Sequence, residues 1–193
     1  MMAYIIIVVV ILIIVSPIIA NLPSARQKQQ MQMRKRAMAA GITIDLTHID
    51  DPDPNPADYL SSTGKPLPRV VAVFAYRMPR RRNEANYEQA PSHWQLVRRG
   101  GPAAPALPAG WQWQDTDLQQ LNAPLRHFLE TRIAALPADV KRLEESKFII
   151  SVYWQEREDG VGLTKIIDFL KDCAALKVIP DATQQGLAND HRE

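Results

Sequence analysis

The feature of this sequence that most limits its fold is an uncharged, apolar stretch near its start, from Ala3 to Leu22. A helix of about 20 residues is about 30 Å long, which matches the hydrocarbon core of a bilayer. Residues 5–15 are all Ile, Val or Leu, and such side chains favour insertion into lipid. In a soluble protein, a helix that is apolar all round needs a large core to cover it. The stretch therefore predicts a transmembrane helix at 3–22.

Basic residues follow the apolar stretch and do not precede it. A secretory signal peptide has positive charge before its apolar region and small residues before its cleavage site, whereas residues 1–4 contain no Lys or Arg and Ile18 stands where a small residue is needed. We therefore expect a retained anchor, with export and cleavage as the alternative. The basic residues are expected to stay on the cytoplasmic side of a bacterial inner membrane, with the N-terminus outside. We expect these basic residues either to set this topology or to bind lipid headgroups. They are Arg26, Lys28, Arg34, Lys35 and Arg36.

The segment 24–40 has the sequence of a short helix. Ser24 suits an N-cap, good helix formers follow it, and Gly41 suits the C-terminal stop. We expect a basic juxtamembrane helix that acts as a stalk between the anchor and a domain at 42–178.

The remaining pattern predicts a small α+β domain with a mixed sheet of about four strands and two or three helices. Alternating or continuous apolar residues predict strands at 41–49, 69–77, 93–99 and 147–156, and Trp111 and Trp113 suit either a strand or a loop. Apolar residues at three- and four-residue steps predict helices at 116–136 and 163–176, with another short helix at 137–145. Proline-rich loops are expected at 50–68 and 101–110, and a disordered tail at 180–193.

Motifs for chemistry are weak throughout the chain. The run "DPDPNP" at 51–56 resembles the start of a calcium loop, but Pro56 and Ser62 stand where that loop needs Gly and Glu. The four histidines lack the spacing of a zinc site, and no glycine-rich phosphate loop occurs. Cys173 falls on an apolar helix stripe, where a small buried side chain is expected. We therefore expect no cofactor, no metal and no catalytic residue.

The densest basic run after the first helix is "RMPRRR". Arginine pairs well with phosphates and with acidic partners, so this run predicts a partner contact formed by Arg77, Arg80, Arg81 and Arg82. The formal net charge of +2 is too small to favour nucleic acid as a ligand. Lipid headgroups or an acidic protein are the better candidates.

The stretch "IIANLPSARQKQQMQMRKRAMAAGITIDL" combines an apolar span, a proline, a basic Gln-rich helix and a strand. In this organisation the chain resembles the YajC-type accessory subunits of the bacterial preprotein translocase, over about its first quarter. As a whole it resembles uncharacterised single-pass inner-membrane proteins of proteobacteria. The resemblance implies an accessory subunit at the inner membrane, and it assigns no functional residue.

Together these features predict a membrane-anchored accessory or scaffold protein whose cytoplasmic domain binds another membrane or membrane-associated protein. One alternative is a preprotein translocase accessory subunit. Another is a membrane-attached enzyme or regulator with a site near His48, Asp50 and Arg80 to Arg82.

Overall fold

The computed structural model describes residues 24–80, 92–101, 104–119, 121–157 and 160–176, together with Met1, Tyr4, Ile13 and Ser16. Most of the stretch at 3–22 and the whole of the predicted tail at 180–193 lie outside these residues. The described part of the chain contains no helix that is long and apolar enough to cross a membrane.

This finding contradicts the predicted single-pass architecture with a transmembrane helix. The α-helices of the described ranges have 15, 10 and 16 residues, whereas a membrane span needs about 20. The fold class of the described residues is corrected to an α+β fold with three α-helices and a six-stranded sheet. The sheet is antiparallel throughout rather than mixed, and it has more strands than the sequence pattern indicates.

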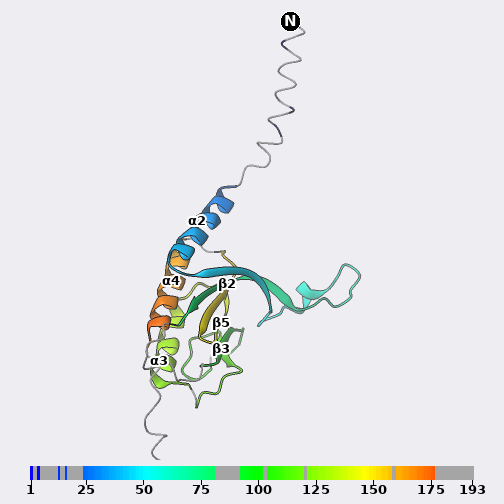
Figure 1. Cartoon of the computed structure of the whole chain (residues 1–193). Coiled ribbons are helices and arrows are strands. Elements are labelled where there is room, and N and C mark those ends of the chain that lie inside the picture. Colours follow the sequence, from blue (N-terminus) through cyan, green and yellow to red (C-terminus); the bar gives the residue numbers. More distant parts are fainter. Residues whose placement is uncertain are drawn as a thin grey trace, which may run out of the picture.

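The strands of the sheet lie in the order β1-β2-β6-β5-β3-β4. The three strands predicted with clear apolar patterns are present as β1 (Thr43–Asp50), β2 (Val70–Pro79) and β6 (Ile149–Trp154). The other three are β3 (Trp94–Arg98), β4 (Trp111–Gln114) and β5 (Val140–Ser146). A 3₁₀ turn, η1 (Pro56–Tyr59), lies in the connection from β1 to β2, which projects away from the rest of the sheet (Figure 1).

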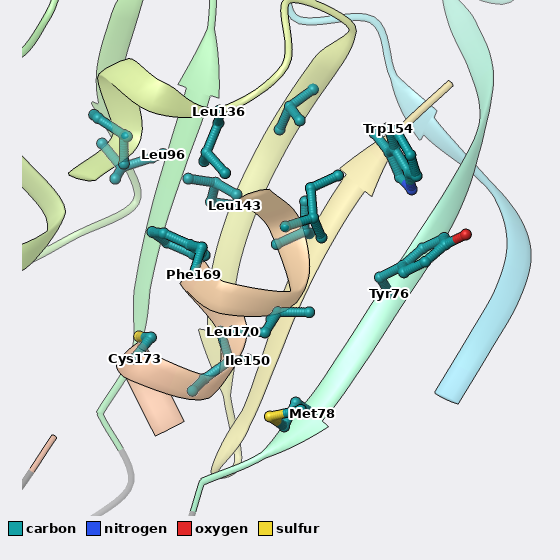
Figure 2. Close-up of a cluster of buried hydrophobic side chains, with 14 of the residues drawn as sticks. Tyr76, Met78, Leu96, Leu136, Leu143, Ile150, Trp154, Phe169, Leu170 and Cys173 are labelled. Atoms are coloured by element: carbon teal, nitrogen blue, oxygen red, sulfur yellow. The ribbon is translucent and has the colours of Figure 1, made fainter. Parts of the chain in front are cut away.

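One face of the sheet is covered by helices α2 (Ala25–Ala39), α3 (Ala123–Arg132) and α4 (Gly160–Ala175), and a 3₁₀ turn, η3 (Ile133–Ala135), follows α3. Figure 1 shows α2, α4 and α3 along the same side of the molecule. Figure 2 shows Phe169 and Leu170 of α4 among apolar side chains of the strands. This face carries the larger core, in which Trp94, Trp154 and Leu143 are fully buried.

α2 is part of this core and is not a separate stalk. Its N-terminus has a complete capping box, in which the Ser24 hydroxyl accepts from the Gln27 N–H and the Gln27 side chain accepts from the Ser24 N–H. Met33 and Ala37, one helical turn apart, are buried against the sheet. The chain then turns at Gly41, where φ is +84°, and enters β1.

The face opposite the helices is enclosed by curling of the sheet. The Arg99 side chain, which follows β3, donates through Nε to the Pro52 carbonyl, which follows β1, at 2.7 Å. In a flat sheet β1 and β3 are about 19 Å apart, because β2, β6 and β5 lie between them. The contact therefore requires strong coiling. Inside the curl lies a second apolar cluster formed by Ile49, Val73, Ala75 and Tyr153, with Val71 packed against it.

The predicted helix at 137–145 is wrong, because these residues form most of β5. A β-bulge shifts the register between Val140 and Arg142, so Val140 and Leu143 both face the helix-covered core although three positions separate them. The hairpin from β5 to β6 then turns at Lys147 and Phe148, where φ is +51° and +64°. Positive φ at both central residues is the geometry of a type I′ turn.

Candidate functional site

β1 forms one edge of the sheet and, among the described strands, pairs only with β2. The Asp51 N–H donates to the Arg69 carbonyl at 2.9 Å, and on the other side of β2 the Arg80 N–H donates to the Phe148 carbonyl at 2.8 Å. Bonded and non-bonded residue pairs alternate along an antiparallel ladder. Odd-numbered residues of β1 therefore bond β2, and even-numbered residues direct their N–H and C=O groups away from the sheet. These outward residues are Ile44, Leu46, His48 and Asp50.

We call this outward-facing backbone of residues 44–50 the free edge. Natural proteins block sheet edges with proline, charged side chains, bulges or short strands, and of these β1 has only the exposed Asp45 and Asp50. It has eight residues in unbroken register with β2, in the sequence TIDLTHID. At its centre Leu46 is 65% exposed, directly across from Phe74 of β2. The opposite edge, β4, has only four residues.

The two ends of β1 carry opposite charges. Before β1, the described residues from 24 to 44 contain basic side chains and no acidic ones, and four of the basic side chains are exposed: Arg26, Lys28, Lys35 and Arg36. From the last residue of β1 onward, the segment 50–58 contains acidic side chains and no basic ones, and three of the acidic side chains are exposed: Asp50, Asp53 and Asp58. The free edge therefore runs from a basic helix to an acidic loop.

Arg34, predicted to set topology or bind headgroups, instead binds a buried carboxylate. Its Nε and Nη2 atoms donate to both oxygens of Glu156 at 2.5 to 3.1 Å, and its guanidinium lies 4.1 Å from the centre of the Phe74 ring. The Tyr76 hydroxyl donates to the same carboxylate at 2.8 Å. The hydrogen bond to Glu156 raises the pKa of Arg34, and burial followed by the Glu156 contact raises the pKa of Tyr76. This network holds α2 on the sheet.

Arg80, predicted as a partner contact, is 7% exposed and forms a second buried network. It donates to both oxygens of Glu145 at 2.6 Å and to the Cys173 carbonyl at 2.7 Å, while the Trp94 indole donates to Glu145 at 2.8 Å. Burial opposes the charge of Arg80, but Glu145 outweighs this effect and raises its pKa. Arg80 thus caps the C-terminal end of α4 rather than facing a partner.

The other predicted contact residues divide between the surface and the undescribed part of the chain. Arg77 is partly exposed and pairs across the strands with Asp45. Arg81 and Arg82 lie outside the described residues.

The described residues of the alternative enzyme site do not come together, and Arg81 and Arg82 lie outside the described residues. His48 and Asp50 lie at the end of β1, where His48 is opposite Ala72 of β2. Arg80 follows the other end of β2, about 26 Å away along the strand at about 3.3 Å per residue. One small substrate cannot contact both ends of this strand at once.

The candidate metal and thiol residues have structural roles. Asp51 accepts from the Tyr59 hydroxyl at 2.7 Å, which raises the pKa of Tyr59 to about 12, and Asn55 accepts from the Ala57 N–H at the start of η1. Among the described residues, no group of three or more His, Cys, Asp or Glu side chains is placed to hold a metal ion. Cys173 is buried as predicted, and burial raises the pKa of its thiol to about 12, so the reactive thiolate is suppressed.

Sequence reasoning missed the two buried glutamates and the edge position of β1. Glu145 lies on the same face of β5 as Leu143, in a stretch rich in charged residues, and Glu156 follows an apolar strand. Neither glutamate therefore stands out in the sequence as buried.

Comparison with protein-family models, curated proteins and solved structures gave no match to this chain.

Proposed function

We propose that this chain is a scaffold protein rather than an enzyme, and that it binds another polypeptide by adding a strand to the free edge. The observation that carries the proposal is the eight-residue edge strand β1, whose outward N–H and C=O groups have no strand partner among the described residues. Strand addition uses such groups for affinity and uses pockets for alternate side chains for specificity.

The free edge is built to receive an extended segment. Each backbone hydrogen bond made in strand addition contributes about 0.5–1.5 kcal/mol net, and the bonds act together along one strand. Leu46, at the centre, offers an exposed side chain on the same face as Phe74, where an incoming strand can cover it. The neighbouring α2 is fixed by the Arg34–Glu156 pair, so the surface beside the edge is held in place before binding.

The proposal also accounts for the use of the charged residues. The most buried ones, Glu145, Glu156 and Arg80, serve to fix helices on the sheet and are inaccessible to a substrate. Exposed charges of opposite sign flank the two ends of β1, where they can select and orient a bound strand.

The test is photo-crosslinking in cells that make the full-length chain. A photoreactive amino acid replaces Leu46 in one variant and Lys165, an exposed residue of α4, in the matched control. We expect one discrete crosslinked product from position 46 and none from position 165. The product from position 46 should disappear with His48→Pro, which removes an outward N–H and keeps the bonds to β2. Absence of a product, or a product that His48→Pro leaves unchanged, would refute strand addition.

A further inference from the structure

We propose that the strand added to the free edge is β1 of a second copy of this chain, arranged antiparallel about a two-fold axis that passes beside Leu46. This inference rests on the proposed function and names its partner. The result is an isologous dimer in which two six-stranded sheets join edge to edge.

The alternation of hydrogen bonds limits the registers of such a dimer. Outward residues must face outward residues, so the symmetric pairings that engage seven residues of β1 are centred at residue 46 or 47, whereas centres at 45 or 48 engage only five. A centre at 48 places Leu46 opposite Asp50 of the other copy, and a centre at 47 places Ile44 opposite that aspartate. A centre at 46 pairs Leu46 with its own equivalent and Ile44 with His48. Of these registers, only the one centred at 46 both engages seven residues of β1 and covers its most exposed apolar side chain with an apolar partner.

The charges at the ends of β1 favour a second copy over an unrelated strand. In an antiparallel pair the start of one β1 lies beside the end of the other, and in the register centred at 46 residue 42 is opposite residue 50. The C-terminal part of α2, with exposed Lys35 and Arg36, is then close to the acidic segment 50–58 of the second copy. The two-fold axis repeats this contact, so both ends of the interface bring opposite charges together.

The first experiment measures self-association of the full-length chain in a non-ionic detergent by sedimentation velocity, over a range of protein and salt concentrations. We expect a monomer–dimer equilibrium that weakens as salt screens the end charges. His48→Pro should raise the dissociation constant by about tenfold or more. This variant leaves the apolar stretch at 3–22 unchanged, so a dimer that persists in it would refute pairing through β1.

Charge exchange tests the antiparallel arrangement. One variant carries Lys35→Glu and Arg36→Glu, and the other carries Asp50→Lys and Asp53→Lys. Each variant alone brings like charges together at both ends of the interface and should dimerise more weakly than the unmodified chain. An equimolar mixture restores opposite charges at both ends and should dimerise again. A mixture no stronger than either variant alone would contradict the arrangement.

Cysteine substitution tests the register. Bonded antiparallel pairs have Cα atoms about 5.5 Å apart, within the range that a disulfide spans. Leu46→Cys should therefore form an interchain disulfide on mild oxidation. His48→Cys should not, because the equivalent residues are then about 13 Å apart along the strand. Native Cys173 is buried and does not compete.

The two proposals fail in different ways. A crosslink from position 46 to a different protein, with this chain monomeric at every concentration, would overturn the self-association and leave strand addition standing. A monomeric chain with no crosslink from position 46 would overturn both.

Discussion

Proline substitution at adjacent residues of β1 tests the hydrogen-bond alternation on which the free edge depends. Proline removes the backbone N–H, so its effect depends on whether that N–H bonds β2 or points outward. Leu46 is an outward residue, whereas Thr47 is paired with Val73 of β2. We expect Thr47→Pro to destabilise the fold strongly and Leu46→Pro to be tolerated, although the two positions are neighbours.

The size of the difference follows from burial. Thr47→Pro removes one ladder bond, of about 0.5–1.5 kcal/mol, and leaves the carbonyl of Val73 without a donor, at about 1–3 kcal/mol for a buried group. Val73 is fully buried, so water cannot replace the lost bond. Leu46→Pro breaks no bond to β2 and removes a mostly exposed side chain, so we expect a change within about 1 kcal/mol. The free energies of unfolding of the two variants should therefore differ by about 2–3 kcal/mol.

Urea unfolding followed by tryptophan fluorescence measures this difference, because Trp94, Trp111 and Trp154 are buried and become exposed on unfolding. The protein concentration is kept at least about tenfold below the dissociation constant of any dimer, so that association does not contribute to stability. Equal destabilisation by the two prolines, or greater destabilisation by Leu46→Pro, would show that the outward and inward residues of β1 are misassigned.

Three further changes test the buried networks and the turn. Arg34→Met should lower the free energy of unfolding by about 1–3 kcal/mol in urea titrations, because it leaves the Glu156 carboxylate buried without its cation, and Glu156→Gln in the same background should recover part of the loss. The Cys173 thiol has an ordinary pKa of 9.0 in the unfolded chain and about 12 in the folded one, so the unfolded chain loses this proton first as the pH rises. The stability that the neutral buried thiol contributes is therefore complete below pH 9 and is lost as the pH rises toward 12. The free energy of unfolding should therefore fall by up to about 1.4 kcal/mol per pH unit above pH 9, and Cys173→Ala should flatten this dependence. Lys147→Gly should stabilise the fold by about 1 kcal/mol by relieving positive φ, and Lys147→Ala, which keeps the side-chain clash, should not.

Local pattern was sufficient to predict β1 and α4, whose apolar residues repeat with the period of the element, and β2 and β6, whose apolar residues are nearly continuous because both faces are covered. It failed for β5, where the bulge makes Val140 and Leu143 share a face at a spacing of three. That spacing, among lysine and glutamate, is also the pattern of a helix. A bulge depends on the strand alongside, so residues 137–145 alone do not reveal it.

The candidate site was less accessible to sequence reasoning than the fold. The pattern TIDLTHID predicts a strand, but whether that strand lies at the edge depends on the order of all the strands. The arginines show the same limit: Arg34 finds its carboxylate 122 residues away and Arg80 finds its carboxylate 65 residues away. From sequence alone, a run of basic residues is expected to be exposed, because the carboxylates that bury Arg80 and half-bury Arg34 are distant along the chain.

The pairing of half-buried Arg34 with buried Glu156 also explains how the exposed basic residues of α2 are positioned. A buried ion pair adds little net stability over apolar packing, but it fixes one arrangement, because each alternative leaves a buried carboxylate without its cation. Glu156 accepts only where α2 presents Arg34 beside Phe74. The rotation of α2 about its axis is thereby set, and Lys35, the next residue, is held on the exposed side. Arg34 thus positions Lys35, whose charge we assign to the dimer interface, although Arg34 itself makes no contact with the second copy.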